Sequence, residues 1–288
     1  MKIMAILNVT PDSFSDGGKY KGIDDILFNA ERLINEGADI IDIGGESTRP
    51  GALKVSAEEE TERIAPVIKV IKSRFDVPIS VDTYKAKVAA EAIREGALII
   101  NDISGGKLDP MMYKTVASYG INKDIKYVLT HNVIGESGAL SGNVSESDIG
   151  LHKAYYVNLL KNELLQLTKE ALSEGIKKEN IILDPGLGFN KTYEQNLWIM
   201  DSLSELCKLN GKSDGEINDD NGYIYPLLVG ASRKSFIGKA LDREVNERLS
   251  GTLATSVIAY LKGASYIRVH DVKENADAVK MAEAIINS

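Results

Sequence analysis

Short apolar runs alternate with longer amphipathic runs from one end of the chain to the other. Most of the short runs are apolar at nearly every position, which is typical of parallel strands buried on both faces. The longer runs carry apolar residues at the spacing of one helical face. The pattern therefore predicts helices between eight strands, at Ile3–Val9, Ile40–Ile43, Ile79–Val81, Leu98–Asp102, Tyr127–Thr130, Ile181–Asp184, Leu227–Val229 and Tyr266–Val269.

The ends of several intervening helices are marked in the sequence. The first helix has Asp24 as its expected N-cap, and Gly37 lies just beyond its end. Gly-Ala steps at Gly37, Gly96 and Gly263 lead from a helix into the next strand, because glycine accepts the left-handed backbone that stops a helix. The predicted apolar faces are Ile26, Leu27, Ala30, Leu33 and Ile34 in the first helix, and Leu249, Leu253, Val257, Tyr260 and Leu261 in the seventh.

Eight strand–helix units in one unbroken series favour a closed (β/α)8 TIM barrel of the α/β class over an open, doubly wound sheet. Such barrels commonly form one domain of about 250 residues, so we expect residues 1–288 to be a single domain. The polar, acidic stretch Gly211–Gly222 has no periodicity and reads as a surface insertion. Because it joins a helix to a strand, it is expected on the face opposite the chemistry.

Composition narrows the class further. Hydrophobic residues make up 43% and charged residues 26%, which suits a globular core that needs no covalent cross-links. The single cysteine, Cys207, excludes an intramolecular disulfide and favours a reducing compartment. A formal net charge of -8 argues against nonspecific binding to nucleic acid. No apolar run approaches the ~20 residues that span a bilayer, and Met1 leads almost directly into a strand, so we expect a cytoplasmic protein.

Polar residues cluster just after the predicted strands, and in a barrel these positions meet at one mouth. Asp82, Asn101 and Asp184 bring acceptor side chains to the end of an apolar core. Buried carboxylates need donors, so the set suggests a ligand with N–H groups, such as an aminopyrimidine. Cations that suit an anionic leaving group follow other strands, at Arg49, Lys234, Arg268 and His270.

Seven of these segments resemble, in order, the signature segments of bacterial-type dihydropteroate synthases, which are pterin-binding barrels. The resemblance covers the chain from the first strand to the last. The segments are Asn8–Gly18, Gly44–Gly51, Ser80–Lys85, Ile100–Gly106, Asp184–Phe189, Ser232–Phe236 and Arg268–His270.

The resemblance implies a transferase that joins 6-hydroxymethyl-7,8-dihydropterin pyrophosphate to 4-aminobenzoate in folate biosynthesis, with catalytic roles for Asp82, Asp184, Lys234 and Arg268. It also implies Mg²⁺ as cofactor with Asn8 as a ligand, sulfonamides as inhibitors, and a homodimer. The implied pterin ligands are Asp82, Asn101, Asp184 and Lys234. The implied pyrophosphate ligands are Asn8, Arg49, Arg268 and His270, and the aminobenzoate site would comprise Phe14, Asp16, Thr48, Pro50, Phe189 and Ser235.

The sequence departs from the family pattern after the fifth strand. Family members commonly have Met-His there, with the methionine packed against the pterin, whereas this chain has Thr130-His131. Glu46 is expected to pair with Arg49 rather than to act as a base. The alternative function is a pterin-binding barrel without aminobenzoate transfer, either a noncatalytic module or the folate-binding part of a corrinoid methyl-transfer system. Such a protein would not need Phe14, the loop around Arg49 and Lys234 together.

Overall fold

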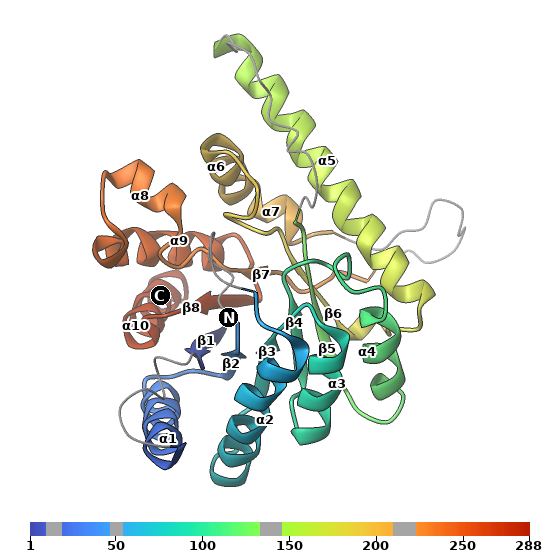
Figure 1. Ribbon diagram of the computed structural model, residues 1–288. Helices are drawn as coiled ribbons and strands as arrows, with labels where there is room; N and C mark the ends of the chain where they lie inside the picture. Colours follow the sequence, from blue (N-terminus) through green and yellow to red (C-terminus); the bar gives the residue numbers. More distant parts are fainter. Residues whose placement is uncertain (10–18, 47–53, 133–145, 210–222) are drawn as a thin grey trace.

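The computed structural model describes residues 1–9, 19–46, 54–132, 146–209 and 223–288. All eight predicted strands are present, and the helices surround them (Figure 1). The strands are β1 Lys2–Asn8, β2 Ile40–Gly44, β3 Ile79–Asp82, β4 Ile99–Asp102, β5 Lys126–Thr130, β6 Ile181–Asp184, β7 Leu228–Val229 and β8 Tyr266–Val269. The helices are α1 Lys19–Asn35, α2 Ala57–Arg74, α3 Ala86–Glu95, α4 Met112–Gly120, α5 Glu146–Ser173, α6 Tyr193–Asp201, α7 Leu203–Leu206, α8 Ser235–Leu241, α9 Leu249–Leu261 and α10 Val272–Ile286, with 3-10 turns at Lys178–Asn180 and Val245–Glu247.

The strands form one sheet in the order β6-β5-β4-β3-β2-β1-β8-β7, and every pair is parallel. A parallel bridge between Leu183 and Leu227 connects β6 to the chain just before β7. The Leu183 amide also donates to the Pro226 carbonyl, at 2.9 Å. These contacts bring the two edge strands together, so the predicted (β/α)8 barrel is confirmed.

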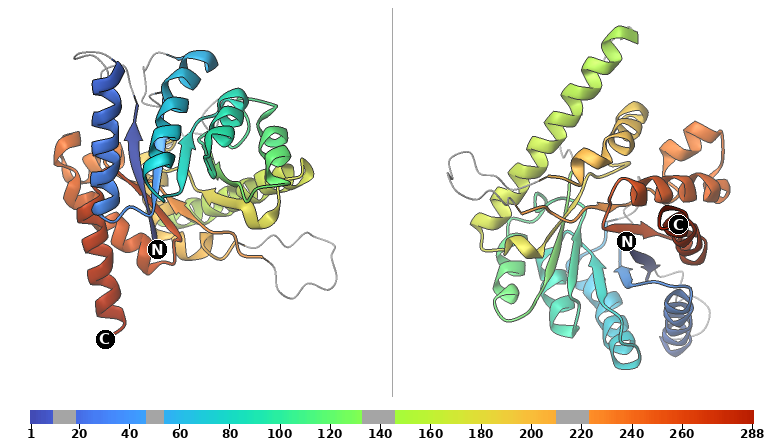
Figure 2. Two further views of the ribbon diagram at one scale, coloured as in Figure 1. Left: turned by 90° about the horizontal axis from the view of Figure 1, so that it is seen from below. Right: turned by 180° about the vertical axis from the view of Figure 1, so that it is seen from behind.

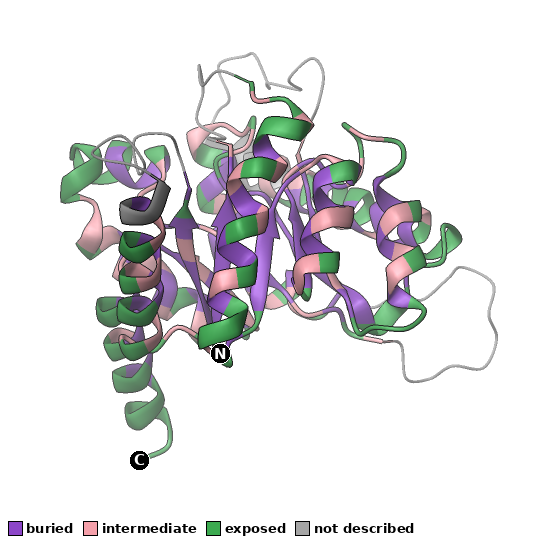
Figure 3. Cartoon of the chain, turned by 60° about the horizontal axis from the view of Figure 1, so that its bottom comes forward, coloured by how far each residue is buried: buried purple, intermediate pink, exposed green. Residues whose placement is uncertain are grey.

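Alternation along the strands divides the core into two parts. Residues that face the helices join a large outer cluster, which includes Ile41, Val81 and Leu129. Figure 3 shows the strands buried along most of their length and the helices exposed on their outer sides. Residues that face the axis make a smaller apolar floor, formed by Met4, Ile40, Ile99, Val128, Ile182 and Leu228. The next inward position on several strands, toward their carboxyl ends, is polar.

The predicted helix ends are partly confirmed. Gly37, Gly96 and Gly263 have φ of 105°, 115° and 94°, so each occupies the left-handed region expected after a helix. Asp24, in contrast, lies inside α1 rather than at its N-cap, and that prediction was wrong. The helix begins earlier, in the polar stretch from Lys19, which an apolar pattern does not reveal.

The seventh predicted helix corresponds to α9, and its predicted residues lie within its bounds. Its fully buried side chains, however, are Thr252, Ser256 and Ala259. Ser256 donates to Asn275 of α10 at 2.7 Å, and the Arg233 amide donates to Thr252 at 3.0 Å. Polar contacts therefore hold the inner face of α9, while Leu261 at its end is 57% exposed.

Two further features concern the outside of the molecule. α5 is the longest helix and extends well past the other elements (Figure 1). Within the described residues, no helix combines the length and apolar character needed to cross a membrane. The segment expected as a polar insertion, residues 211–222, lies outside the described part of the chain.

Candidate active site at the carboxyl ends of the strands

Arg268 lies at the centre of the polar layer above the apolar floor. Its Nε donates to Asp42 Oδ2 and its terminal nitrogen donates to Asp82 Oδ2, both at 2.6 Å. Asn101 Nδ2 donates to the same oxygen of Asp42, at 3.2 Å. Side chains from β2, β3, β4 and β8 thus meet inside the barrel, although up to 226 positions separate them in the sequence.

Burial and charge oppose each other at this centre. Asp42 is fully buried and Asp82 is 7% exposed. Burial raises the pKa of Asp82, Arg268 opposes that rise, and the nearby Asp42 adds to it. Burial by itself would lower the pKa of Arg268, but Asp42 and Asp82 raise it beyond its ordinary value. Arg268 therefore remains charged and shares its charge between two carboxylates.

Asp184 and Lys234 lie on the other side of the mouth. Asp184 ends β6, and its Oδ1 accepts a hydrogen bond from the Gly186 amide at 2.7 Å. Burial raises the pKa of Asp184, with Gly186 and Lys234 opposing the rise. Lys234 Nζ lies 4.0 Å from the centre of the Phe189 ring. Burial lowers the pKa of Lys234 to about 8, although Asp184 favours its charged form.

Several buried polar atoms of this layer have no hydrogen-bond partner among the described residues. They include one oxygen each of Asp42 and Asp82 and the hydroxyl of Thr130. Unsatisfied buried groups are costly and uncommon in native proteins, so their concentration on inward positions points to a ligand or water. Asp102 is a useful contrast, because it faces outward and accepts from Ser104 and Tyr127. The unsatisfied groups thus belong to the mouth.

Asp42 is a functional candidate that the sequence analysis missed. It was counted as part of the apolar run Ile40–Ile43. The signal was present, because a carboxylate in the middle of a strand that is otherwise buried and apolar requires a partner. Its partner Arg268, however, lies on a strand near the other end of the chain, and the sequence pattern does not show that pairing.

The predicted pyrophosphate ligands are partly described. Asn8 is the last residue of β1 and is exposed at the mouth. His270 lies two residues beyond Arg268, and its Nδ1 is 2.9 Å from Ser232 Oγ. Arg268 is held by two carboxylates, which places it beside the predicted pterin ligands as well. Among the other predicted site residues Ser235 begins α8, while those outside the described ranges are Phe14, Asp16, Thr48, Arg49 and Pro50.

Glu46 follows β2 and contacts the loop that follows β3. It accepts from the Tyr84 hydroxyl at 3.0 Å and forms an ion pair with Lys85, which also pairs with the buried Glu60. Since Arg49 lies outside the described residues, its expected pairing with Glu46 stays a prediction. The observed network holds the segment that follows β2 against α2 and against the loop after β3.

The loops after β5 and β6 are joined by Lys191. Its Nζ donates to the carbonyl of His131 at 2.9 Å and to that of Phe189 at 3.2 Å. Burial lowers the pKa of Lys191 to about 7, and Asp184 opposes that shift. His131 Nε2 lies 2.5 Å from Glu163 of α5. Lys191 was not predicted as a site residue; it holds the backbone at Phe189 and lies close enough to Asp184 and Lys234 to interact with their charges.

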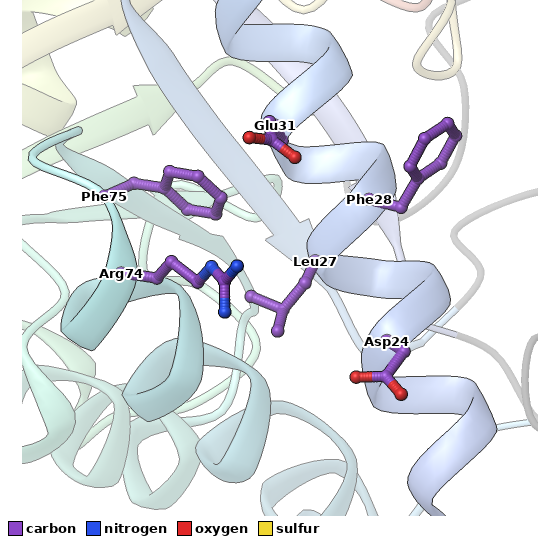
Figure 4. Close-up of a pocket in the computed structure, with 6 residues that line it drawn as sticks. All are labelled: Asp24, Leu27, Phe28, Glu31, Arg74 and Phe75. Atoms are coloured by element: carbon purple, nitrogen blue, oxygen red, sulfur yellow. The ribbon is translucent and has the colours of Figure 1, made fainter.

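A small surface cavity of about 170 Å³ lies elsewhere, between α1 and α2 (Figure 4). Arg74 ends α2 and Phe75 follows it, before β3, so the cavity lies toward the amino ends of the strands. It has no connection to the polar layer, and the mouth of the barrel remains the candidate site. The other lining residues are Asp24, Leu27, Phe28 and Glu31.

The sequence model for pterin-binding enzymes matches residues 4–270. This range includes β2 to β8, all of β1 except its first two residues, and the whole polar layer. The chain therefore belongs to the pterin-binding enzyme family.

Known relatives narrow the assignment. The dihydropteroate synthase of Clostridium beijerinckii is 47% identical over 99% of this chain and 94% of its own length. A Clostridium difficile dihydropteroate synthase structure, solved in the presence of pteroic acid, has a TM-score of 0.82 at 42% identity, covering 100% of this chain and 97% of that one. A Xanthomonas albilineans dihydropteroate synthase with 4-aminobenzoic acid has a TM-score of 0.83 at 35% identity, covering 100% and 93%. Within the family, the chain groups with the dihydropteroate synthases.

Proposed function

We propose that this enzyme transfers the dihydropterin, through its methylene carbon, from 6-hydroxymethyl-7,8-dihydropterin pyrophosphate to 4-aminobenzoate, giving 7,8-dihydropteroate and pyrophosphate. One observation carries the proposal. Carboxylates with unsatisfied oxygens, Asp42 and Asp82, share a buried layer with Asp184, and the cations Arg268 and Lys234 lie beside them. This arrangement suits a ligand that offers N–H donors on one edge and negative charge at the other end.

Asp82, Asn101 and Asp184 would hold the pterin by hydrogen bonds from its aminopyrimidine edge. The three side chains are at most 7% exposed, so the ring would be held away from water. In low dielectric, such charge-assisted hydrogen bonds are stronger than in solution. Related structures support this assignment, since a Xanthomonas albilineans dihydropteroate synthase was solved in complex with 7,8-dihydropteroate.

The reaction would begin with cleavage of the C–O bond between the pterin methylene and pyrophosphate, whose oxygen keeps the electron pair. The positive charge left on the pterin methylene spreads into the ring, where Asp82 and Asp184 stabilise it. Lys234, Arg268 and His270 stabilise the departing anion. The aromatic amine then forms the C–N bond and releases a proton to solvent. Orientation of the two substrates supplies the rest of the rate enhancement, and no protein nucleophile is needed.

Mg²⁺ would be held by Asn8 together with pyrophosphate oxygens and water, and when bound it would neutralise the negative charge of the leaving group. Within the described residues there is no cluster of three or more His, Cys, Asp or Glu side chains that fits a metal ion. This fits Mg²⁺, which keeps several waters and commonly binds through substrate phosphates. The exposed Asn8 amide at the mouth provides a protein ligand of the oxygen type that Mg²⁺ prefers.

The 4-aminobenzoate site would lie above the pterin, between Phe189 of the loop after β6 and Ser235 of α8. Phe189 lies against Lys234, which connects this site to the pterin layer. Sulfonamides would occupy the same place. A Yersinia pestis dihydropteroate synthase, 38% identical to this chain, was solved with a sulfonamide drug complex.

The enzyme would act as a homodimer through the outer faces of α9 and α10, which pack against each other. Large apolar side chains are exposed on both helices near their carboxyl ends, and exposed patches of this kind mark association sites. Figure 2 shows the end of α10 projecting beyond the barrel. The exposed apolar residues are Ile258, Leu261, Met281, Ile285 and Ile286.

The direct test supplies purified protein with pterin pyrophosphate, 4-aminobenzoate and Mg²⁺ and measures both pyrophosphate and dihydropteroate. We expect both products in equal amounts. Pterin binding without pyrophosphate release would instead support the noncatalytic or methyl-transfer alternative. Asp184→Asn should lower kcat/KM about 100-fold, because it removes a charge that acts on the transition state. Full turnover by that variant would contradict the mechanism.

A further inference from the structure

Thr130 is the last residue of β5, and its side chain faces the barrel axis. Val128, two positions earlier, belongs to the apolar floor, while Leu129 faces the outer core, so strand alternation directs Thr130 inward. Its register partner on β6 is Asp184. Thr130 is 1% exposed. It therefore occupies the same level of the barrel as the predicted pterin ligands.

The Thr130 hydroxyl has no hydrogen-bond partner among the described residues. The other buried threonines of the described chain all have one. Thr83 accepts from the Lys85 amide at 3.2 Å, Thr168 donates to a carbonyl of its own helix at 2.7 Å, and Thr252 accepts from the Arg233 amide at 3.0 Å. An unsatisfied buried hydroxyl destabilises a fold, and valine has the same shape without that cost. Among the described residues of the free protein, the hydroxyl of Thr130 thus makes no hydrogen bond.

The hydrogen-bonding groups of this layer indicate which kind of ligand atom the Thr130 hydroxyl would contact. Asp42, Asp82 and Asp184 accept hydrogen bonds, and the Arg268 donors that the structure pairs are directed at Asp42 and Asp82. A pterin ring also carries acceptors, a carbonyl oxygen and ring nitrogens, which need donors. The Thr130 hydroxyl is a donor in this layer that no described protein group uses.

We propose that Thr130 donates a hydrogen bond to an acceptor on the pterin ring and is a specificity-determining residue of the pterin site. The proposal rests on the proposed function and adds one contact to it. Because the family pattern has methionine here, the contact would be a property of this chain. Thr130 would act on the pterin and not on 4-aminobenzoate, since it lies in the strand layer beside Asp184 and below the loop residue Phe189.

The test compares Thr130→Val with Thr130→Ser. Binding of 6-hydroxymethyl-7,8-dihydropterin pyrophosphate, with Mg²⁺ and without 4-aminobenzoate, is measured by calorimetry. Loss of one hydrogen bond should weaken binding by Thr130→Val about five- to tenfold, whereas Thr130→Ser stays within about twofold of the parent. KM for 4-aminobenzoate should not change. The free Thr130→Val protein should also melt at a higher temperature than the parent, because it no longer buries an unsatisfied hydroxyl.

The melting measurement distinguishes a ligand contact from a structural one. If the hydroxyl supports the fold, Thr130→Val melts lower and binds pterin as the parent does, and the proposal is overturned. If valine does not fit the site, Thr130→Ala removes the same hydroxyl and provides the binding comparison. Parent protein that binds no pterin would overturn the proposed function and this inference together. A parent that binds and a Thr130→Val that binds equally would overturn only the inference.

Discussion

Arg268 shows how one residue controls the charge of the site. It supplies the cation for two buried carboxylates that come from different strands. Removing one partner of a buried ion pair leaves the other charges uncompensated, which costs far more than losing a surface pair.

We therefore expect Arg268→Met to lower the free energy of unfolding by about 3–5 kcal/mol, measured in urea at neutral pH. The matched control is Arg94→Met, which removes the exposed pair with Glu91 on α3 and should cost less than about 1 kcal/mol. Equal effects of the two substitutions would show that the Asp42 and Asp82 charges are compensated by other means.

Lys234 should give the reaction an alkaline limit. Burial lowers the pKa of its amine to about 8 in the free protein, so the cation is lost as the pH rises through that value. If Lys234 binds the anionic substrate, kcat/KM for pterin pyrophosphate should fall about tenfold per pH unit above about pH 8. A pH profile of Lys234→Met should be flatter in this range, with a lower plateau. An unchanged alkaline limb in the variant would assign the titration to another group.

The lowered pKa of Lys234 affects folding stability in the opposite direction to activity. The unfolded lysine titrates near 10.5, so between about pH 8 and 10.5 the unfolded chain binds more protons than the folded one. Folding stability contributed by this group therefore rises with pH across that window, even as activity falls. Unfolding curves of the parent and of Lys234→Met at pH 8 and pH 10 should show this difference in slope.

Sequence reasoning at this scale succeeded where residue type and strand position agreed. Asp82, Asn101, Asp184, Lys234 and Arg268 were expected at one mouth, and the structure brings them together. Their individual roles stay predictions. Asp42 was missed because its role depends on its pairing with Arg268 inside the barrel. That pairing depends on the register of the strands, which the sequence pattern does not reveal.

At the scale of elements, the loops after β5 and β6 form one unit. Lys191 binds carbonyls of both, and the His131 amide donates to the Asp184 carbonyl at 2.8 Å. Gly186 lies where they touch, with φ of 69°. A Cβ at this glycine would lie 1.9 Å from the His131 carbonyl oxygen, so the backbone of one loop would have to move.

Gly186→Ala should destabilise the protein by more than about 2 kcal/mol, because strain at positive φ adds to the backbone clash. It should also raise KM for the pterin substrate, since Asp184 and Thr130 flank the displaced segment. The control is Gly120→Ala at the end of α4, where a Cβ meets nothing within 4 Å and φ is not positive. Thermal unfolding and steady-state kinetics check both variants. A Gly186→Ala protein as stable and active as the control would contradict the close loop contact.

Element boundaries were predictable only where the pattern marks them. The glycine ends of α1, α3 and α9 were visible in the sequence because left-handed backbone selects glycine. The start of α1 was not, since its first turn is polar. In α9 the apolar residues pointed to a helix but not to its buried face, which hydroxyls of Thr252 and Ser256 line. Their partners Arg233 and Asn275 come from neighbouring units, so the choice is a tertiary effect.

At the scale of the whole molecule, eight repeated units predicted a closed barrel, but they did not show how β6 and β7 would pair. β7 has only two residues, and β6 meets it through the single bridge at Leu227. The apolar run Leu227–Val229 predicted the strand itself, but so short a run does not define its pairing. Repetition of the unit therefore carries fold prediction further than the properties of any one strand.

The exposed apolar ends of α9 and α10 give the last prediction. Leu261 and Met281 are 57% and 60% exposed, and each belongs to the surface proposed to bind a second copy. A dimer buries these side chains and a charge there opposes association, so Leu261→Glu with Met281→Glu should shift the mass measured by light scattering from dimer to monomer. Ile121→Glu, at a 73% exposed position after α4, should leave the dimer intact. A monomeric parent protein would contradict the dimer directly. Because each chain carries its own complete polar layer, the monomeric variant should still bind pterin.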